Sequence, residues 1–285
     1  MKILLTGANG QLGRCFIDRV PKDWDVFATD TSELDITNQD MVFETIKKYS
    51  PDIIVNAAAY TAVDKAESDC EIAMQVNAMG PSNLALASKK YSSLLIHIST
   101  DYVFDGHAVK PYDEESSTNP LSVYGKTKLD GELLVSRGNP ESIIIRTAWV
   151  FSEYGNNFVK TMLKLGREKE SLAIISDQFG CPTYAGDIAE AIISMIKMKA
   201  KNGIYHFCGN EIVSWHEFAK RIFFQAHKNN KLDKIPVINA ITTSEYPTAA
   251  TRPQYSVLNC NKISSIGIAP SDWNDRLAFV IDNID

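Results

Sequence analysis

The stretch Lys2-Ile3-Leu4-Leu5-Thr6-Gly7-Ala8-Asn9-Gly10-Gln11-Leu12-Gly13 predicts how the fold begins. Its first five residues form a short apolar run typical of a buried strand, and Gly7, Gly10 and Gly13 follow at regular spacing. Apolar residues at helical intervals up to Val20 predict a helix directly afterwards. A strand, a glycine turn and a helix in this order present backbone N–H groups to a pyrophosphate. We therefore expect a dinucleotide at these glycines.

The glycine spacing limits this interpretation. It is Gly-x-x-Gly-x-x-Gly rather than Gly-x-Gly-x-x-Gly, and no Gly-Lys-Ser/Thr follows, so a P-loop is not expected. A tight turn without a ligand is the alternative. The position of the motif directly after the first strand favours the nucleotide.

The composition indicates an ordinary globular protein. The chain has 285 residues, enough for one large or two modest domains, and it is 45% apolar and 22% charged, which suffices for a sizeable core. A formal net charge of −6 argues against a surface that binds nucleic acid. The five cysteines are scattered and lack Cys-x-x-Cys spacing, so we expect reduced thiols and neither disulfides nor a metal site.

The apolar runs are short throughout the sequence. The run at the N-terminus is too short for a signal peptide, and no later run approaches the length of a membrane span. We therefore expect a cytoplasmic protein that does not enter a membrane.

Strands and helices are predicted to alternate from the first residues onward. Further apolar runs predict strands at residues 26–29, 52–55, 93–98 and 143–147. Helical periodicity separates them at residues 38–49 and 70–90, and a helix is expected to carry Tyr124 and Lys128. This alternation is typical of a Rossmann-like, doubly wound parallel sheet in the α/β class. We expect an NAD(P)-binding domain over residues 1–150.

The second half of the chain is less regular. Helices are predicted at residues 158–166, 187–199 and 215–228, with a short strand at 203–207. Ser214, with Glu217 three residues later, is typical of a capping box. Four prolines after residue 235 predict a loop-rich end. We assign residues 151–285 mainly to a smaller substrate-binding domain and expect residues 187–207 to rejoin the first domain.

Polar or small residues follow several predicted strands, where open α/β sheets bind ligands. Asp30 ends the second strand; a carboxylate there accepts hydrogen bonds from ribose hydroxyls and repels a 2′-phosphate, which favours NADH over NADPH. A turn cap is the alternative for this side chain. Ala57, Ala58 and Ala59 follow the third strand and would let a cofactor lie against the backbone. The fourth strand runs into Ser99-Thr100-Asp101, a polar cluster well placed for chemistry.

Tyr124 and Lys128 lie four residues apart, on one face of the predicted helix. A nearby ammonium lowers the pKa of a phenol and suits it to exchange a proton with a substrate oxygen. By itself the spacing equally fits a solvated helix face.

Together these segments resemble the extended short-chain dehydrogenase/reductases and, within them, the dTDP-4-dehydrorhamnose reductase family. The matching stretches include residues 55–67, 99–106, 146–151, 177–183 and 246–253. The resemblance implies NAD(P)H-dependent reduction of the C4 keto group of dTDP-4-dehydro-L-rhamnose to dTDP-L-rhamnose.

The resemblance also implies roles for individual residues. Tyr124 would protonate the substrate oxygen, Lys128 would hold the nicotinamide ribose and lower the tyrosine pKa, and Thr100 would hydrogen-bond the same oxygen. Further cofactor contacts would come from Gln11, Leu12, Asp35 and Ile36, in addition to the glycines, Asp30 and the three alanines. Substrate contacts would come from Thr61, Thr100, Asp101, Trp149 and Arg252.

Two departures from the family pattern matter. Arg252-Pro253-Gln254-Tyr255-Ser256 replaces a common Arg-Pro-x-Asn-Ser, which weakens the assignment of a nucleotide contact there. Some relatives bind a divalent ion at a dimer contact near the first helix, but Cys15 occupies this region, so no metal is carried over. Whether the chain forms a homodimer stays open.

Two other functions compete with the reductase. A sister epimerase or dehydratase is one, although dehydratases carry Thr-Asp-Glu where this chain has Thr100-Asp101-Tyr102. A regulatory subunit of the methionine adenosyltransferase type is the other. The presence of Thr100, Tyr124 and Lys128 favours an enzyme.

Overall fold

The computed structural model describes residues 1–284 and contains a central sheet of six parallel strands. The strands are β1 (Lys2–Thr6), β2 (Asp25–Thr29), β3 (Ile53–Asn56), β4 (Leu94–Thr100), β5 (Ile143–Thr147) and β10 (Gly203–His206). Their spatial order is β10-β5-β4-β3-β1-β2, so the chain leaves β1 toward one edge and returns at β3 toward the other. Such a switch point is where open α/β sheets form a ligand crevice. The predicted α/β class and parallel sheet are confirmed.

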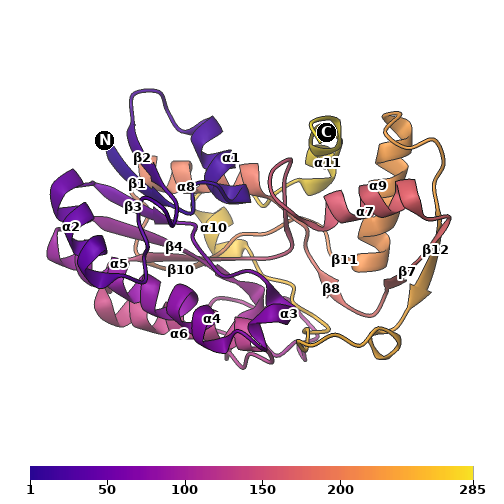
Figure 1. Cartoon of the computed structure of the whole chain (residues 1–285), viewed down its shortest axis with the longest axis horizontal. Coiled ribbons are helices and arrows are strands. Elements are labelled where there is room, and N and C mark those ends of the chain that lie inside the picture. Colours follow the sequence, from indigo (N-terminus) through magenta and orange to yellow (C-terminus); the bar gives the residue numbers. More distant parts are fainter. Residues whose placement is uncertain (285) are drawn as a thin grey trace.

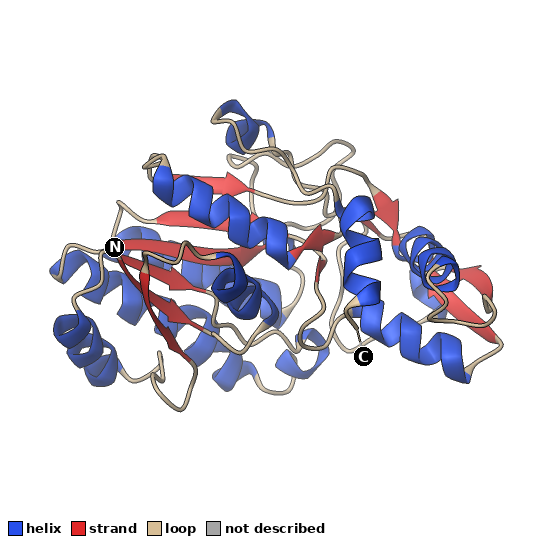
Figure 2. Cartoon of the chain, turned by 90° about the horizontal axis from the view of Figure 1, so that it is seen from above, coloured by secondary structure: helices blue, strands red, loops and turns tan. Residues whose placement is uncertain are grey.

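Helices cover both faces of the sheet (Figures 1 and 2). One face carries α1 (Gln11–Arg19) and α8 (Ala185–Lys197), and the other carries α2 (Gln39–Tyr49), α5 (Gly80–Lys90) and α6 (Val123–Gly138). Each face has its own apolar core, because strands buried on both sides place alternate side chains on opposite faces. Short helical segments join these elements: α3 (Val63–Ala66), α4 (Cys70–Met74), a π-helix (Gln75–Met79), a 3₁₀-helix (Asp101–Val103) and α10 (Asn261–Ser265).

A smaller lobe lies beside the sheet, on the right in Figure 1. It contains α7 (Phe158–Glu168), α9 (Trp215–Lys228) and α11 (Trp273–Asp282), together with the parallel pair β7 (Ser171–Ile175) and β12 (Val237–Ile241). Shorter pieces are β6 (Val150–Phe151), β8 (Phe179–Gly180), β9 (Thr183–Tyr184), β11 (Val213–Ser214) and a 3₁₀-helix (Thr243–Glu245). A separate aromatic-rich core holds this lobe together.

Several local predictions are confirmed. The helix expected at residues 38–49 forms as α2, and Ser214 and Glu217 form the predicted capping box of α9. Residues 203–206 pair with β5 and extend the sheet, and α8 packs on α1. The predicted loop-rich end is wrong in two places, because β12 and α11 form there by pairing with β7 and by burying Trp273 and its neighbours.

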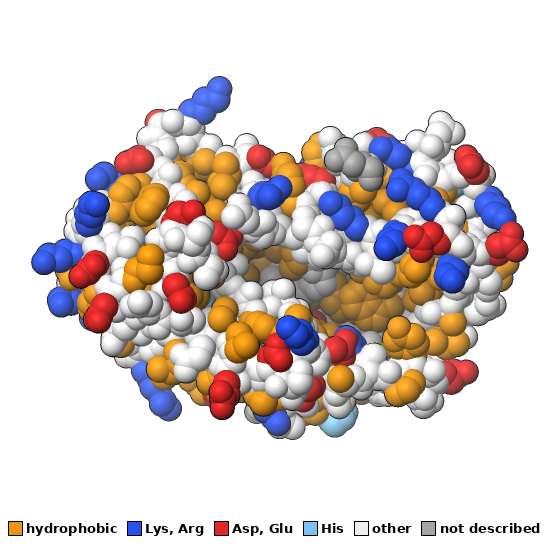
Figure 3. All heavy atoms as spheres, viewed as in Figure 1, with side chains coloured by type: hydrophobic (Ala, Val, Ile, Leu, Met, Phe, Trp, Pro, Cys, Tyr) orange, Lys and Arg blue, Asp and Glu red, His pale blue; other side chains and the backbone are white. Residues whose placement is uncertain are grey.

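The two lobes enclose a hollow, visible in Figure 3. Much of its wall on the side of the smaller lobe is hydrophobic. Thr100 and Thr147 are register partners at the ends of β4 and β5, so the residues that follow these strands emerge at the same edge of the sheet. Side chains from both halves of the chain can therefore meet at this edge.

Candidate active site

The glycine turn lies against the chain segment that follows β3. Gly7 has φ +70°, and a Cβ there would come within 2.6 Å of Ala58 N and 2.7 Å of the Ala57 carbonyl carbon. Gly13 is equally crowded, by Gly7 and Ala8. The turn therefore needs glycine for its conformation and for close contact. The turn thus brings Gly7, after β1, into contact with Ala57 and Ala58, after β3.

Asp30 holds the glycine turn to the end of β2. Its Oδ2 accepts the N–H of Asn9 at 3.0 Å, and its Oδ1 accepts the N–H of Thr31 at 2.8 Å. The turn-capping interpretation of Asp30 is thus realised in the structure. Each carboxylate oxygen accepts more than one hydrogen bond, so the same group can also meet a ribose hydroxyl.

The remaining expected cofactor residues are distributed around this turn. Asp35 accepts hydrogen bonds from the backbone and side chain of Thr37. Ile36 is buried against Gly80, where a Cβ would come within 2.6 Å of its side chain. Gln11 Oε1 accepts from Ser152 at 3.0 Å and is thereby tied to the segment that leads into the smaller lobe.

Thr100 and Tyr124 meet where β4 ends and α6 begins. Ser122 caps α6 through the N–H of Gly125, which places Tyr124 in the first turn. Burial raises the pKa of Tyr124 to about 12, and a hydrogen bond with Thr100 opposes this rise. Thr100 Oγ1 also donates to Asp101 Oδ1 at 3.0 Å. The phenol is therefore neutral at ordinary pH and lies beside the predicted threonine.

Lys128 lies one turn further along α6 and is 2% exposed. Its Nζ donates to the carbonyl oxygen of Ile98 at 2.5 Å. Burial lowers its pKa to about 8. The expectation that Lys128 lowers the pKa of Tyr124 is not met in this structure, because the ammonium is directed at β4 and burial dominates the tyrosine.

Asp101 and Tyr102 complete the polar end of β4. Asp101 is buried, which raises its pKa to about 6, and its Oδ2 has no hydrogen-bond partner within residues 1–284. The ring of Tyr102 packs edge-on against Tyr124, with centroids 5.5 Å apart. A carboxylate that has a spare buried oxygen at this point is suited to accept a hydroxyl from a ligand.

A buried ion pair that no sequence pattern indicated lies beneath the edge of the sheet where Thr100 and Tyr124 meet. Arg146 on β5 donates to both carboxylate oxygens of Glu132 on α6, at 2.9 and 2.7 Å, and both side chains are 3% exposed. Ser99 donates to the same carboxylate at 2.5 Å. Arg146 begins the matching stretch 146–151, but a motif does not show which partner a side chain has.

The expected substrate residues occupy different surroundings. Trp149 has φ +46°, a left-handed conformation that costs a bulky residue about 1–3 kcal/mol and persists only where its neighbours enforce it. Arg252 forms a bidentate ion pair with Asp64, at 3.0 and 2.6 Å, and a hydrogen bond with Tyr102. Thr61 is exposed. The sequence did not predict that Asp64 would be the partner of Arg252.

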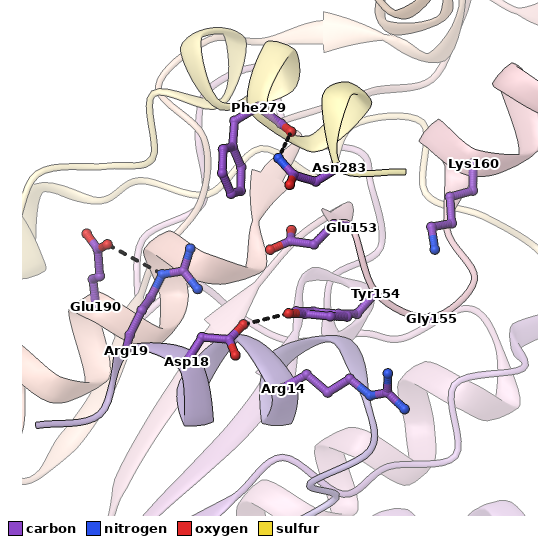
Figure 4. Close-up of a pocket in the computed structure, with 10 residues that line it drawn as sticks. All are labelled: Arg14, Asp18, Arg19, Glu153, Tyr154, Gly155, Lys160, Glu190, Phe279 and Asn283. Carbon is purple, nitrogen blue, oxygen red and sulfur yellow. Dashed lines mark hydrogen bonds and ion pairs between the residues drawn. The ribbon is translucent and has the colours of Figure 1, made fainter. Parts of the chain in front are cut away.

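A pocket of about 670 Å³ is lined by Arg14, Asp18 and Arg19 of α1 and by residues of the smaller lobe (Figure 4). This is the region near Cys15 where some relatives were expected to bind an ion. Tyr154 donates to Asp18 at 2.8 Å, and Arg19 lies 3.5 Å from Glu190. Among residues 1–284, no group of three or more His, Cys, Asp or Glu side chains is arranged to hold a metal ion. Basic and acidic side chains line this pocket together: Arg14, Arg19, Lys160, Asp18, Glu153 and Glu190.

Known proteins match the chain over its whole length. The family model described as RmlD substrate binding domain matches residues 1–285. A dTDP-4-dehydrorhamnose reductase from Aggregatibacter actinomycetemcomitans is 48% identical over 284 residues, which cover 97% of each chain. The chain belongs to the dTDP-4-dehydrorhamnose reductase family. The resemblance predicted from its motifs is confirmed.

Solved structures of dTDP-4-dehydrorhamnose reductases agree with this family. One from Clostridium acetobutylicum is 42% identical, with a TM-score of 0.93 and 99% of both chains covered. Another, from Bacillus anthracis in complex with NADP, is 38% identical, with a TM-score of 0.92 and 99% of this chain and 98% of that chain covered. The roles of individual residues in this family member, including the expected site and domain division, stay predictions. Within residues 1–284 no helix is long and apolar enough to cross a membrane.

Proposed function

We propose that this chain reduces the C4 keto group of dTDP-4-dehydro-L-rhamnose with NAD(P)H and yields dTDP-L-rhamnose. The observation that carries the proposal is the meeting of Thr100, Tyr124 and Lys128 at the carboxyl end of β4, in a chain that matches this reductase family throughout. The same edge of the sheet faces the glycine turn across the switch point. Redox chemistry and proton transfer thus share one crevice.

Tyr124 is the proton donor in this proposal. When bound, the nicotinamide supplies a hydride to C4, and the carbonyl oxygen gains negative charge. Tyr124 gives its phenolic proton to that oxygen, while Thr100 donates a hydrogen bond to it; the phenolate then regains a proton from water. A positioned acid of this kind contributes about 10²–10⁴-fold to the rate.

Lys128 stabilises the anion that Tyr124 leaves behind. Its ammonium, which donates to the carbonyl oxygen of Ile98, would have to turn towards Tyr124 to oppose the cost of forming a buried phenolate. We also assign to Lys128 the contact with the nicotinamide ribose, one helical turn from Tyr124 on α6.

Recognition of the nucleotide sugar is assigned to the smaller lobe and its junction with the sheet. We assign Trp149 to the sugar or base and the N–H groups of Arg252 to the diphosphate. Thr61 and Asp101 complete the proposed substrate contacts. The positions of Trp149 after β5 and of Arg252 beside Tyr102 support these assignments.

The cofactor preference follows from Asp30. A carboxylate at the adenosine ribose accepts its hydroxyls and repels a 2′-phosphate, so we assign NADH as the better cofactor and NADPH as a weaker one. We further propose that the enzyme acts in the cytoplasm, with a homodimer as an assembly to be tested by sedimentation.

The decisive test is oxidation of NADH by the purified chain with dTDP-4-dehydro-L-rhamnose, with the product identified by NMR. Formation of dTDP-L-rhamnose with equal loss of NADH is expected. Cofactor that stays bound while C4 is inverted would identify an epimerase, and binding without turnover would identify a regulatory protein. Tyr102, standing where dehydratases carry a glutamate, supports reduction over dehydration.

A further inference from the structure

The segment between β6 and α7 ties the side chain of Gln11 to the smaller lobe. Gln11 is the first residue of α1, next to the glycine turn where the cofactor diphosphate is expected. Its Oε1 accepts two hydrogen bonds, from Ser152 Oγ at 3.0 Å and from Asn157 Nδ2 at 2.9 Å. Tyr154 donates to Asp18 of α1 at 2.8 Å and holds the same segment to that helix (Figure 4). This segment is therefore fastened to α1 at two points, and Gln11 is one of them.

The role of Asn157 as a helix cap decides which atom of its amide faces Gln11. Its Oδ1 accepts the N–H of Lys160 at 3.1 Å and thereby caps α7. Its Nδ2 donates to the carbonyl oxygens of Ser152 and Tyr154, at 2.8 and 3.3 Å, as well as to Gln11. Because an NH₂ group needs an acceptor, the Gln11 atom that faces it must be the oxygen Oε1. The cap of α7 thus fixes the orientation of a second amide, on α1.

The amide nitrogen of Gln11 is left free by this arrangement. Within residues 1–284 the side chain forms only the two hydrogen bonds accepted by Oε1, and Nε2 keeps contact with solvent. The side chain of the first residue of a helix leans toward the helix N-terminus. Here α1 begins at Gly10 with no side-chain cap and no acidic residue in its first turn. Nε2 is therefore a spare donor at a helix N-terminus, where backbone N–H groups are suited to a diphosphate.

We infer that Asn157 is a positioning residue for the cofactor: it holds Gln11 Oε1, so that Nε2 of the same amide donates to the cofactor diphosphate. This inference rests on the proposed function in one respect, the nicotinamide dinucleotide at the glycine turn. Ser152 cannot replace Asn157, because a hydroxyl can donate to Oε1 or accept from Nε2 equally well. Without Asn157 the Gln11 amide can turn over and present its oxygen to the anion, and cofactor binding must then reorder it at a cost in affinity.

The experiment measures the binding of ADP-ribose and NADH to Asn157→Ser. Serine keeps an oxygen for the cap of α7 but has no amide N–H for Gln11. The dissociation constant for ADP-ribose, measured by calorimetry, should rise about three- to tenfold, the range expected for one hydrogen bond. KM for NADH should rise by the same factor, with kcat and KM for the dTDP-sugar unchanged. Asn239→Ser removes an exposed amide donor to Ser171 in the same lobe and is the matched control, which should change none of these values.

A double-mutant cycle tests whether Asn157 acts through Gln11. Gln11→Ala removes the proposed donor and leaves the backbone N–H groups of α1 in place, so it should weaken ADP-ribose binding to a similar degree. When Asn157→Ser is added to Gln11→Ala, it should have little further effect, because the amide that Asn157 orients is gone. Adenosine, which lacks the diphosphate, should compete for the site with the same inhibition constant in all four proteins of the cycle.

The outcomes separate the inference from the function on which it rests. Unchanged affinity for ADP-ribose in folded Asn157→Ser would overturn the positioning role. Losses that add in full in the double variant would also overturn it, because Asn157 would then act through the fold of its own segment. A wild type that does not bind ADP-ribose would overturn it as well. A wild type that shows the expected cycle but does not reduce the dTDP-sugar would overturn the proposed function and leave this inference intact.

Discussion

Two bidentate arginine–carboxylate pairs lie in contrasting surroundings: Arg146 donates through Nε and Nη2, and Arg252 through Nη1 and Nη2. Arg146 and Glu132, beneath the catalytic edge, have both side chains 3% exposed, whereas Arg252 and Asp64, at the junction with the last part of the chain, are 21% and 46% exposed. Removing one partner of a buried pair leaves a charge that water cannot reach, but an exposed charge is readily solvated. The first pair is therefore a permanent support, and the second can share its arginine with a ligand.

The contrast extends to the regions around the two pairs. At the catalytic edge, burial raises the pKa of Tyr124 and lowers that of Lys128, so proton transfer there depends on exclusion of water. At the junction, the Arg252 guanidinium donates to Asp64 and to the carbonyl oxygen of Ala250, so a diphosphate would have to share it with these partners. Changes at the first region should act on turnover or stability, and changes at the second on substrate affinity.

The largest effect is expected from the catalytic region. Tyr124→Phe removes the proposed proton donor and should lower kcat about 10²–10⁴-fold, with KM for NADH little changed. Steady-state kinetics on the folded variant provide the measurement, and Tyr91→Phe at the end of α5 is a control. Near-normal turnover in Tyr124→Phe would remove this residue from the mechanism.

The two ion pairs can be compared directly by their stability. Glu132→Gln leaves Arg146 as an uncompensated buried charge and should cost about 3–5 kcal/mol in the free energy of unfolding. Asp64→Asn, at a more exposed bidentate pair, should cost less than about 1 kcal/mol. Urea denaturation of both variants measures the difference. If both variants lost a similar free energy of unfolding, the buried pair would not be a stronger structural support than the Arg252–Asp64 pair.

Cofactor choice tests the glycine turn at the same sheet edge. Asp30→Ala should shift the ratio of kcat/KM for NADH and NADPH toward NADPH by about one to two decades, because a like-charge repulsion is removed. Asp30 also caps the turn, so some loss of affinity for both cofactors is expected. A wild-type preference for NADPH that survives Asp30→Ala would show that Asp30 does not contact the ribose.

The pH dependence tests the buried lysine. Because burial lowers the pKa of Lys128 to about 8, its charge is present below that pH and is lost as the pH rises through it. The kcat/KM for NADH should therefore fall above about pH 8, approaching tenfold per pH unit. Lys128→Arg retains a charge at high pH and should lose this alkaline limb, whatever its overall activity. An alkaline limb that persists in Lys128→Arg belongs to another group.

The smallest effect is expected at the junction. Arg252→Lys keeps a positive charge but loses the planar fork, and should raise KM for the dTDP-sugar several-fold, about 1 kcal/mol, without changing KM for NADH. Lys65→Arg is the control. Lys65 follows Asp64 in the sequence and forms its own ion pair with Asp69. Equal KM values in wild type and Arg252→Lys would leave Arg252 as a partner of Asp64 alone.

The sequence by itself determined the features that short stretches encode. The order of strand, glycine turn and helix at residues 2–20 can be read from adjacent residues, and so can the capping box of Ser214 and Glu217. Tyr124 and Lys128 share a helix, so their spacing placed them on one side of it before any tertiary contact was known. The family motifs were likewise readable as continuous stretches.

The tertiary structure decided what depends on distant partners and on exclusion of water. Neither the choice of Asp64 by Arg252 nor the stacking of Trp215 on Trp149 follows from a motif, because these partners are 188 and 66 residues apart. The same holds for the pKa of Tyr124, which burial raises although the neighbouring lysine suggested the opposite. Burial and long-range pairing are properties of the folded chain, and they set the charges and orientations on which this site depends.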